Sequence, residues 1–249
     1  MVLWLAANAA LFAIAYLLGS TPTGYWVTYR LAGFDIRRHG SKSTGATNVL
    51  RVLGKKPALF VFIVDILKAV LAIAIVRWVY ATPELRAIVP SGLVAQDWQA
   101  WIETLAGIWA IVGHTYSLWL LVGPGRDPEL TSGGKAVASS LGVLLALSWP
   151  VGLATFGAFA SVLAISRIVS LGSIVAGVFV AVLMPLSGQP LPYCLFAAIA
   201  GLYVVVRHRA NIARLRAGTE PRIGEKAAET VSEPVSEPIA ETPPEPLGS

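Results

Sequence analysis

Residues 57–80 read PALFVFIVDILKAVLAIAIVRWVY, an apolar run that carries only three charged side chains, Asp65, Lys68 and Arg77. An α-helix rises about 1.5 Å per residue, so about 20 residues of this kind cross the roughly 30 Å hydrocarbon core of a bilayer. The stretch therefore predicts a transmembrane helix, and apolar runs on either side of it repeat the pattern.

The chain as a whole has the composition of a membrane protein. Of its 249 residues, 55% are hydrophobic and 13% are charged, whereas soluble domains carry about 25% charged residues. We expect an all-α fold, a polytopic integral membrane helical bundle. The net charge of +5 comes from basic residues in short loops between the apolar runs. This placement indicates topology signals and contact with anionic lipid rather than nucleic-acid binding.

Seven apolar runs are candidate membrane spans, and Pro22 should kink the first of them. No Lys or Arg precedes Arg30, so the first run lacks the basic segment of a secretory signal peptide. The fourth and fifth runs are short, and the alternative is five spans, with these two only dipping into the membrane. The seven runs are approximately 2–29, 57–80, 104–122, 136–149, 151–166, 169–187 and 191–207.

The charges in the loops predict the orientation. The 30–56 loop holds seven basic residues and one acidic residue, and 207–226 holds six basic and two acidic residues. The 81–103 loop holds one basic and three acidic residues. Because basic loops stay on the cytoplasmic side, we expect the N-terminus outside and the C-terminus cytoplasmic.

The last part of the chain differs from the rest. From residue 225 a glutamate recurs at every fourth position, and prolines interrupt any helix. With so few apolar residues the segment cannot form a core. We therefore predict a membrane domain over 1–224 and a disordered, acidic, proline-rich tail over 225–249.

Polar residues in or beside a membrane are costly, so they point to function. The loop 35–51 is rich in Gly and Ser, and residues 45–53 predict a short helix. On that helix Thr47, Asn48 and Arg51 share one face. A helix N-terminus with an arginine suits a phosphate group. A solvated basic loop is the alternative, and the spacing alone favours neither.

A second basic, Gly-rich segment precedes the fourth run, where Gly133, Gly134 and Lys135 form a helix start suited to anions. It is not a Walker P-loop, because Glu129 stands where that motif needs Gly and Ala136 where it needs Ser or Thr. Nucleotide hydrolysis is therefore not expected.

Five more polar residues lie within the apolar runs or at their ends, and each can be given a role. Asp65 and Lys68 are spaced to pair on one helix face, and we assign the pair a structural role. His114 is interpreted as a satisfied histidine between helices. His208 and Asn211 lie three apart at a helix end, so both can point into one site. The histidines are far apart in sequence and the chain has one cysteine, so no metal site is expected.

Taken in order, these motifs resemble those of the bacterial acyl-phosphate:glycerol-3-phosphate acyltransferases. The longest block is GATNVLRVLG at 45–54, and the matches run in family order from about residue 19 to 224. The sequence departs from the family pattern at Ser41-Lys42-Ser43, where Ser-Gly-Asn is usual, and at Ala136, where Gly is usual. The other matching blocks are Gly19-Ser20, Gly40-Ser41, Asp65-Ile66-Leu67-Lys68, Gly113-His114, Gly133-Gly134-Lys135, Ser170-Leu171-Gly172-Ser173, His208-Arg209-Ala210-Asn211-Ile212 and Gly218-Thr219-Glu220-Pro221.

The resemblance implies transfer of a fatty acyl group from acyl phosphate to the glycerol-3-phosphate 1-hydroxyl, which gives lysophosphatidic acid and phosphate. It implies a multi-pass enzyme of the bacterial inner membrane, surrounded by lipid, with no cofactor and no obligate protein partner. It assigns catalytic roles to Ser41, Lys135, His208 and Asn211. It assigns substrate binding to Ser43, Gly45, Thr47, Asn48, Arg51, Gly133, Gly134 and Ser170.

In this scheme Arg51 and Lys135 bind phosphate, and the neutral polar side chains supply oriented hydrogen bonds. Acyl phosphate is already activated, so a covalent intermediate is unnecessary. A phosphate has a second pKa of about 6, and we hypothesise that the substrate itself takes the hydroxyl proton while His208 orients it. A small-anion transporter is the alternative, since it too places broken helices and basic residues in the membrane. No inverted repeat is visible between the two halves of the sequence.

Overall fold

The computed structural model describes residues 1–93, 98–123, 126–127, 130 and 133–224. Every regular element in these residues is helical, as predicted. The predicted tail at 225–249 lies outside the described residues. The elements are α1 Val2–Ser20, α2 Thr23–Ala32, η1 Ile36–Arg38, α3 Ala46–Leu53, α4 Lys55–Ala81, α5 Pro83–Ala87, η2 Ser91–Leu93, α6 Trp98–Thr115, α7 Leu118–Val122, α8 Val137–Leu147, α9 Trp149–Ser166, α10 Val169–Leu186, α11 Leu191–Arg207 and α12 Arg209–Arg216.

Helices form at all seven predicted spans. Five stretches are long and apolar enough to cross a membrane, namely α1 with α2, α4, α6 with α7, α9, and α10. α11 passes the same test only together with α12, from which it bends by 58°. α8 has 11 residues, which make about 16 Å of helix and fall short of the hydrocarbon thickness. The number of full crossings and the orientation therefore stay predictions.

The third span begins earlier than the sequence predicts. α6 starts at Trp98, so Glu103, expected in an outer loop, lies inside a helix and is 3% exposed. Its carboxylate is 2.6 Å from the Arg77 guanidinium and accepts a hydrogen bond from the Tyr193 hydroxyl at 2.8 Å. The partners come from α4 and α11, and they make burial of this charge tolerable. The predicted boundary was wrong because the partners are distant in sequence.

The break between α1 and α2 lies at Pro22, where a kink was expected. The backbone carbonyl of Thr21 accepts a hydrogen bond from Lys68 Nζ at 2.9 Å. Lys68 also lies 2.8 Å from Asp65 Oδ1, so the predicted pair is confirmed. A backbone group freed at a kink within the membrane needs such a partner, and the charged pair of α4 supplies it.

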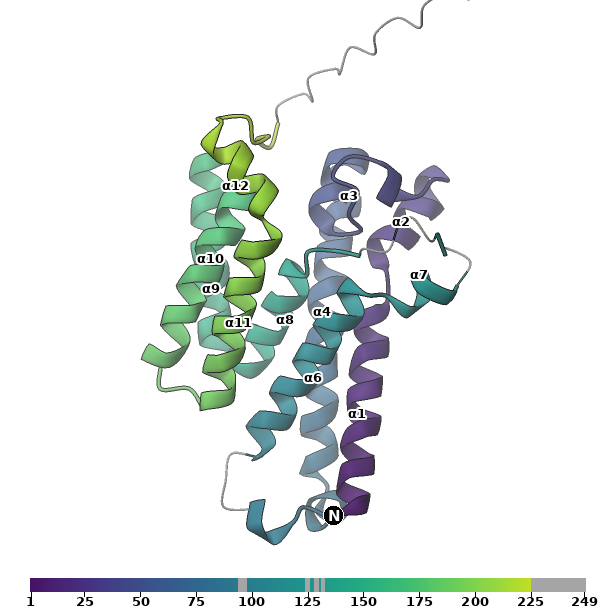
Figure 1. The fold of residues 1–249 in the computed structure, drawn as a ribbon, viewed down its shortest axis with the longest axis vertical. Coiled ribbons are helices and arrows are strands. Elements are labelled where there is room, and N and C mark those ends of the chain that lie inside the picture. The colour runs from purple at the N-terminus through teal and green to yellow at the C-terminus, as the bar shows by residue number, and fades with distance from the viewer. Residues whose placement is uncertain (94–97, 124–125, 128–129, 131–132, 225–249) are drawn as a thin grey trace, which may run out of the picture.

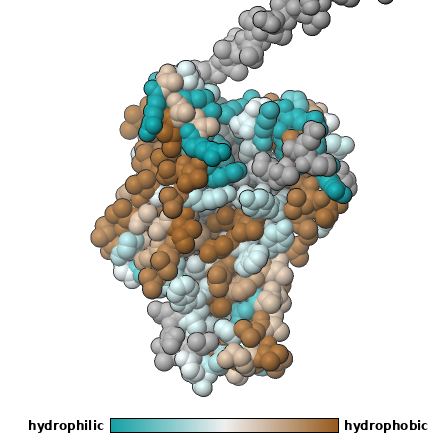
Figure 2. Space-filling model, viewed as in Figure 1, coloured by the Kyte–Doolittle hydropathy of each residue, from teal (hydrophilic) through white to brown (hydrophobic). Residues whose placement is uncertain are grey.

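The helices form two groups with α8 between them (Figure 1). α1, α4 and α6 pack on one another, and α10 packs on both α9 and α11. Gly19 lets α1 approach α6 closely, because a Cβ there would lie 2.0 Å from the Ala110 carbonyl oxygen. Leu71, Val178 and Leu202 are among the large apolar side chains on the surface. Figure 2 shows apolar side chains over much of one face and a hydrophilic upper end, as expected for a body in lipid.

Candidate active site

A cavity of about 360 Å³ lies near the hydrophilic end of the bundle, and we call it the polar chamber. Its polar lining comes from the loop before α3, α3 itself, α4, the end of α6, the segment before α8, the start of α10 and the junction of α11 with α12. Ten of the twelve predicted site residues line it, so segments far apart in sequence meet as expected. The ten are Ser41, Ser43, Gly45, Thr47, Asn48, Arg51, Lys135, Ser170, His208 and Asn211.

Asn48 organises the loop that precedes α3. Its side-chain amide donates to the backbone carbonyls of Ile36, His39 and Ser43, at 3.2, 3.0 and 2.8 Å. Its Oδ1 accepts from the Ser41 N–H at 2.8 Å. An amide has two N–H groups and one carbonyl oxygen, so the loop engages both ends of this side chain. Asn48, predicted to bind substrate, lines the cavity and also holds the loop that carries Ser41 and Ser43.

Lys135 and Asn211 meet across the polar chamber. Lys135 Nζ donates to Asn211 Oδ1 at 2.6 Å, and Arg51 lines the same cavity. Burial lowers the pKa of Lys135 from its ordinary value, and the nearby Arg51 guanidinium lowers it further. Two cationic side chains held close together in one cavity form a site for an anion.

Glu220 is a central residue of this site to which the sequence analysis gave no role. Its carboxylate accepts hydrogen bonds from Ser170 Oγ at 2.7 Å, Asn211 Nδ2 at 2.6 Å and Arg214 Nε at 2.7 Å. Burial by itself would raise the pKa of Glu220, but the hydrogen bonds from Asn211, Ser170 and Arg214 lower it below its ordinary value. The sequence pointed to Glu220 only through the Gly218–Pro221 block, one of the blocks that resemble the family.

His208 sits at the bend between α11 and α12 and is 4% exposed. Its Nδ1 lies 2.7 Å from the Val204 carbonyl oxygen. A carbonyl only accepts, so Nδ1 carries a proton and the neutral ring presents Nε2 as an acceptor. The side chain is thereby oriented at the wall of the polar chamber.

Gly133 and Gly134 were predicted to bind substrate, but neither lines the cavity. The Gly133 N–H donates to the Thr115 carbonyl at 2.9 Å. A Cβ on Gly133 would lie 2.4 Å from the His114 carbonyl oxygen, and one on Gly134 would lie 2.1 Å from His114 Nε2. The two glycines are therefore needed for close contact with the end of α6, which sets the position of Lys135. The helix that they were expected to open begins only at Val137.

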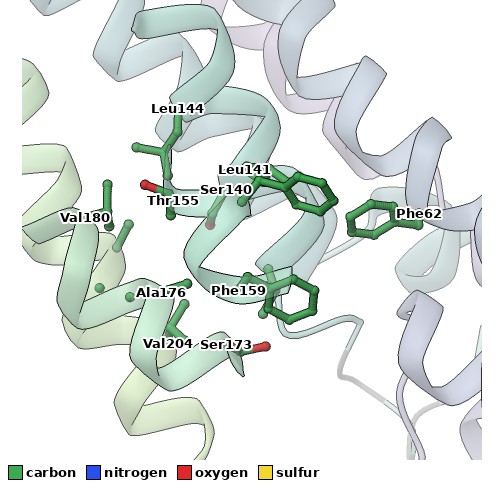
Figure 3. Close-up of a pocket in the computed structure, with 15 residues that line it drawn as sticks. Phe62, Ser140, Leu141, Leu144, Thr155, Phe159, Ser173, Ala176, Val180 and Val204 are labelled. Carbon is green, nitrogen blue, oxygen red and sulfur yellow. The ribbon is translucent and has the colours of Figure 1, made fainter. Parts of the chain in front are cut away.

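A second cavity, the apolar branch, adjoins the polar chamber and has a volume of about 60 Å³. Figure 3 shows Leu141 and Leu144 of α8, Phe159 of α9 and Val180 of α10 around it. The two cavities share five lining residues, so they lie directly next to each other. The shared residues are Phe62, Val137, Phe156, Phe159 and Ser173. The site as a whole therefore joins a cationic compartment to an apolar one.

The sequence is similar to those of named proteins. The family model described as glycerol-3-phosphate acyltransferase matches residues 9–218. The glycerol-3-phosphate acyltransferase of Trichormus variabilis is 54% identical over 91% of this chain and 96% of its own length. That of Acaryochloris marina is 51% identical over 92% of this chain and 97% of its own.

Two crystal structures of PlsY (YgiH), an integral membrane glycerol 3-phosphate acyltransferase, have a similar fold. The glycerol 3-phosphate form superposes with a TM-score of 0.70 at 33% identity, covering 88% of this chain and 96% of that one. The lysophosphatidic acid form gives a TM-score of 0.68 over the same shares. With the family model matching most of its length, this chain belongs to the glycerol-3-phosphate acyltransferase family.

Proposed function

We propose that this acyltransferase uses acyl phosphate as its donor, acylates the 1-hydroxyl of glycerol-3-phosphate, and releases lysophosphatidic acid and phosphate. We place it in the bacterial inner membrane, with its active-site loops within 1–224 facing the cytoplasm. One observation carries the proposal, namely that the polar chamber and the apolar branch lie side by side and share five lining residues. An acyl phosphate has a charged head and an apolar chain, and this pair of cavities matches both parts. The family assignment favours transfer over the transport alternative.

The cations of the polar chamber would bind the phosphate groups. Arg51 presents a planar fork of N–H donors that suits two phosphate oxygens at once, and Lys135 supplies a point charge. Ser41, Ser43 and Thr47 line the same cavity and add neutral donors. Lys135 stabilises the charge that develops on the leaving phosphate.

The transfer step balances without a cofactor. The 1-hydroxyl oxygen forms a bond to the acyl carbonyl carbon, the bond from that carbon to the phosphate oxygen breaks, and the hydroxyl proton passes to the departing phosphate. Phosphate can take it because its second pKa is about 6. His208 orients the hydroxyl through Nε2, while Ser170 and Asn211 are held in place by Glu220.

The acyl chain would lie in the apolar branch. The junction of the two cavities carries the aromatic rings of Phe62, Phe156 and Phe159. Burial of an acyl chain there is favourable by about 0.8 kcal/mol per CH₂ relative to water. The reacting carbonyl then sits where the two cavities meet.

The test compares donors with purified protein in detergent. With glycerol-3-phosphate as acceptor, palmitoyl phosphate and palmitoyl-CoA are offered separately and lysophosphatidic acid is measured. We expect product with palmitoyl phosphate and background with palmitoyl-CoA. Efficient use of palmitoyl-CoA alone would refute the proposed donor.

A further inference from the structure

A buried polar cluster lies beneath the polar chamber. Lys68 Nζ lies 2.8 Å from Asp65 Oδ1, 2.9 Å from the Thr21 carbonyl oxygen and 2.9 Å from His114 Nδ1. An ammonium group has three N–H donors and no lone pair. Three partners at these distances use all three donors, so each partner accepts.

His114 is therefore neutral, with Nδ1 as an acceptor and its proton on Nε2. Asp65 does not compete for the ring, because its Oδ1 is 3.7 Å from His114 Nδ1, beyond hydrogen-bond distance. Asp65 instead balances the charge of Lys68 and accepts from Thr23 Oγ1 at 3.2 Å. Lys68 thus fixes the tautomer of the histidine.

The Nε2–H of His114 is left as a donor beside the phosphate site. His114 is 7% exposed and lines the polar chamber. Its Nε2 lies against Gly134, where an added Cβ would come within 2.1 Å, and Lys135 is the next residue. Within the described part of the chain, the one hydrogen bond of its side chain is the contact of Nδ1 with Lys68. A ring N–H on a residue that lines the cavity, with no protein acceptor, is available to a ligand bound there.

We infer that His114 Nε2–H donates to an anionic phosphate oxygen of the substrate bound beside Lys135, and that Lys68 is a positioning residue which holds His114 in the donating tautomer. The inference rests on the proposed function, which places the phosphate of acyl phosphate beside Lys135. The phosphate of glycerol-3-phosphate has the same anionic oxygens and can accept the same hydrogen bond. A neutral donor suits this place, because a second full charge next to Lys68 would repel it. Gly134 leaves room for the His114 ring, because a Cβ at this position would lie 2.1 Å from Nε2.

Two amide variants separate the donor from the packing role. His114→Asn places an acceptor near Nδ1 and keeps the contact with Lys68, but it has no group at the position of Nε2. His114→Gln reaches the position of Nε2 with an N–H. We expect both to fold with melting temperatures near that of the wild type. Loss of a donor to developing charge costs about 10²–10³ in rate, so His114→Asn should lose about 100-fold in kcat/KM while His114→Gln stays within about tenfold of the wild type.

The kinetic pattern identifies which phosphate is bound. A rise in KM for acyl phosphate, or a fall in kcat, assigns the donor's phosphate, and a rise in KM for glycerol-3-phosphate assigns the acceptor's. A folded His114→Asn enzyme with wild-type kinetics for both substrates would overturn the inference, as would equal losses in the Asn and Gln variants. The wild type is assayed alongside with acyl phosphate and acyl-CoA. If the wild type forms no lysophosphatidic acid from acyl phosphate, the proposed function is refuted. The variants are then compared with the donor that does give product.

The tautomer has its own readout in ¹⁵N NMR of histidine-labelled protein in micelles. We expect the His114 signal, assigned by its loss in His114→Gln, to show a protonated Nε2 and an unprotonated Nδ1. Adding glycerol-3-phosphate or inorganic phosphate should shift the Nε2 resonance. A proton on Nδ1 in the wild type would refute the positioning role of Lys68.

Discussion

Lys135 and Asn211 are joined by a 2.6 Å hydrogen bond although 76 residues separate them in the sequence. The contact links the segment before α8 to α12, on opposite sides of the polar chamber. Asn211 in turn donates to Glu220, so the cation that we assign to phosphate binding is anchored to a carboxylate through one amide.

Lys135→Ala should remove a charge that stabilises the leaving phosphate. We expect kcat/KM to fall by about 10²–10³, measured as lysophosphatidic acid formed by the purified variant. Lys56→Ala is the matched control, because Lys56 is exposed on α4 and does not line the polar chamber. Lys56→Ala should keep wild-type kinetics. Normal kinetics in the Lys135 variant would remove this residue from the site.

His208→Gln should retain clearly more activity than His208→Ala. The Nδ1 contact with Val204 leaves Nε2 to orient the hydroxyl, and an amide can replace that hydrogen bond but cannot act as a base near neutral pH. A general base contributes about 10²–10⁴ in rate. Equal and complete loss in both variants, with normal expression and substrate binding, would show that histidine takes the proton and that the substrate does not.

Glu220 should make the protein less stable as the pH becomes acidic. Its pKa is lowered below the ordinary value of 4.5 in the folded state, so its carboxylate contributes stability above about pH 4.5 and loses that contribution as pH falls through the folded pKa. Glu220→Gln should be less stable at pH 7 by about 1–3 kcal/mol and should lose less stability on acidification. Thermal unfolding in detergent at several pH values measures both effects.

Glu84→Gln is the control for this experiment, since Glu84 is exposed on α5. It should unfold like the wild type across the same pH range. An identical pH profile for wild type and Glu220→Gln would contradict the assigned role of Glu220.

Ala176→Phe should shift donor preference toward shorter acyl chains. Ala176 lines the apolar branch and is 8% exposed, so a phenyl ring there occupies space for the end of the chain. Displacing two CH₂ groups costs about 1.6 kcal/mol, or about tenfold in kcat/KM for a long-chain donor relative to a short one. Val178→Phe on the same helix faces outward, with 56% exposure, and should leave chain preference unchanged. An unaltered preference in Ala176→Phe would place the chain elsewhere.

The sequence was sufficient to predict the helices and most of the cavity lining. Uninterrupted apolar runs specify membrane helices because lipid tolerates little else, and the expected short helix over 45–53 is α3, Ala46–Leu53. The polar residues of these loops converge because the apolar helices bring them together at one end of the bundle. The helices follow from local composition alone, whereas the roles of the cavity residues also rest on the resemblance to the acyltransferases.

The roles that depend on packing between distant segments were not predictable. Glu220 acts through Ser170, 50 residues away, and Glu103 is buried because Arg77 and Tyr193 reach it from other helices. Asn48 shares a helix face with Arg51, yet its amide turns to the preceding loop. Helical spacing defines which residues share a face, but it does not define what that face contacts.

The central claim is acyl transfer from acyl phosphate to the 1-hydroxyl, and oxygen tracing tests it most directly. Purified protein is given palmitoyl phosphate and glycerol-3-phosphate labelled with ¹⁸O at the 1-hydroxyl, and both products are analysed by mass spectrometry. We predict one phosphate released per lysophosphatidic acid, with all of the label in the ester and none in the phosphate. Phosphate that carries the label, or lysophosphatidic acid formed without phosphate release, would contradict the account.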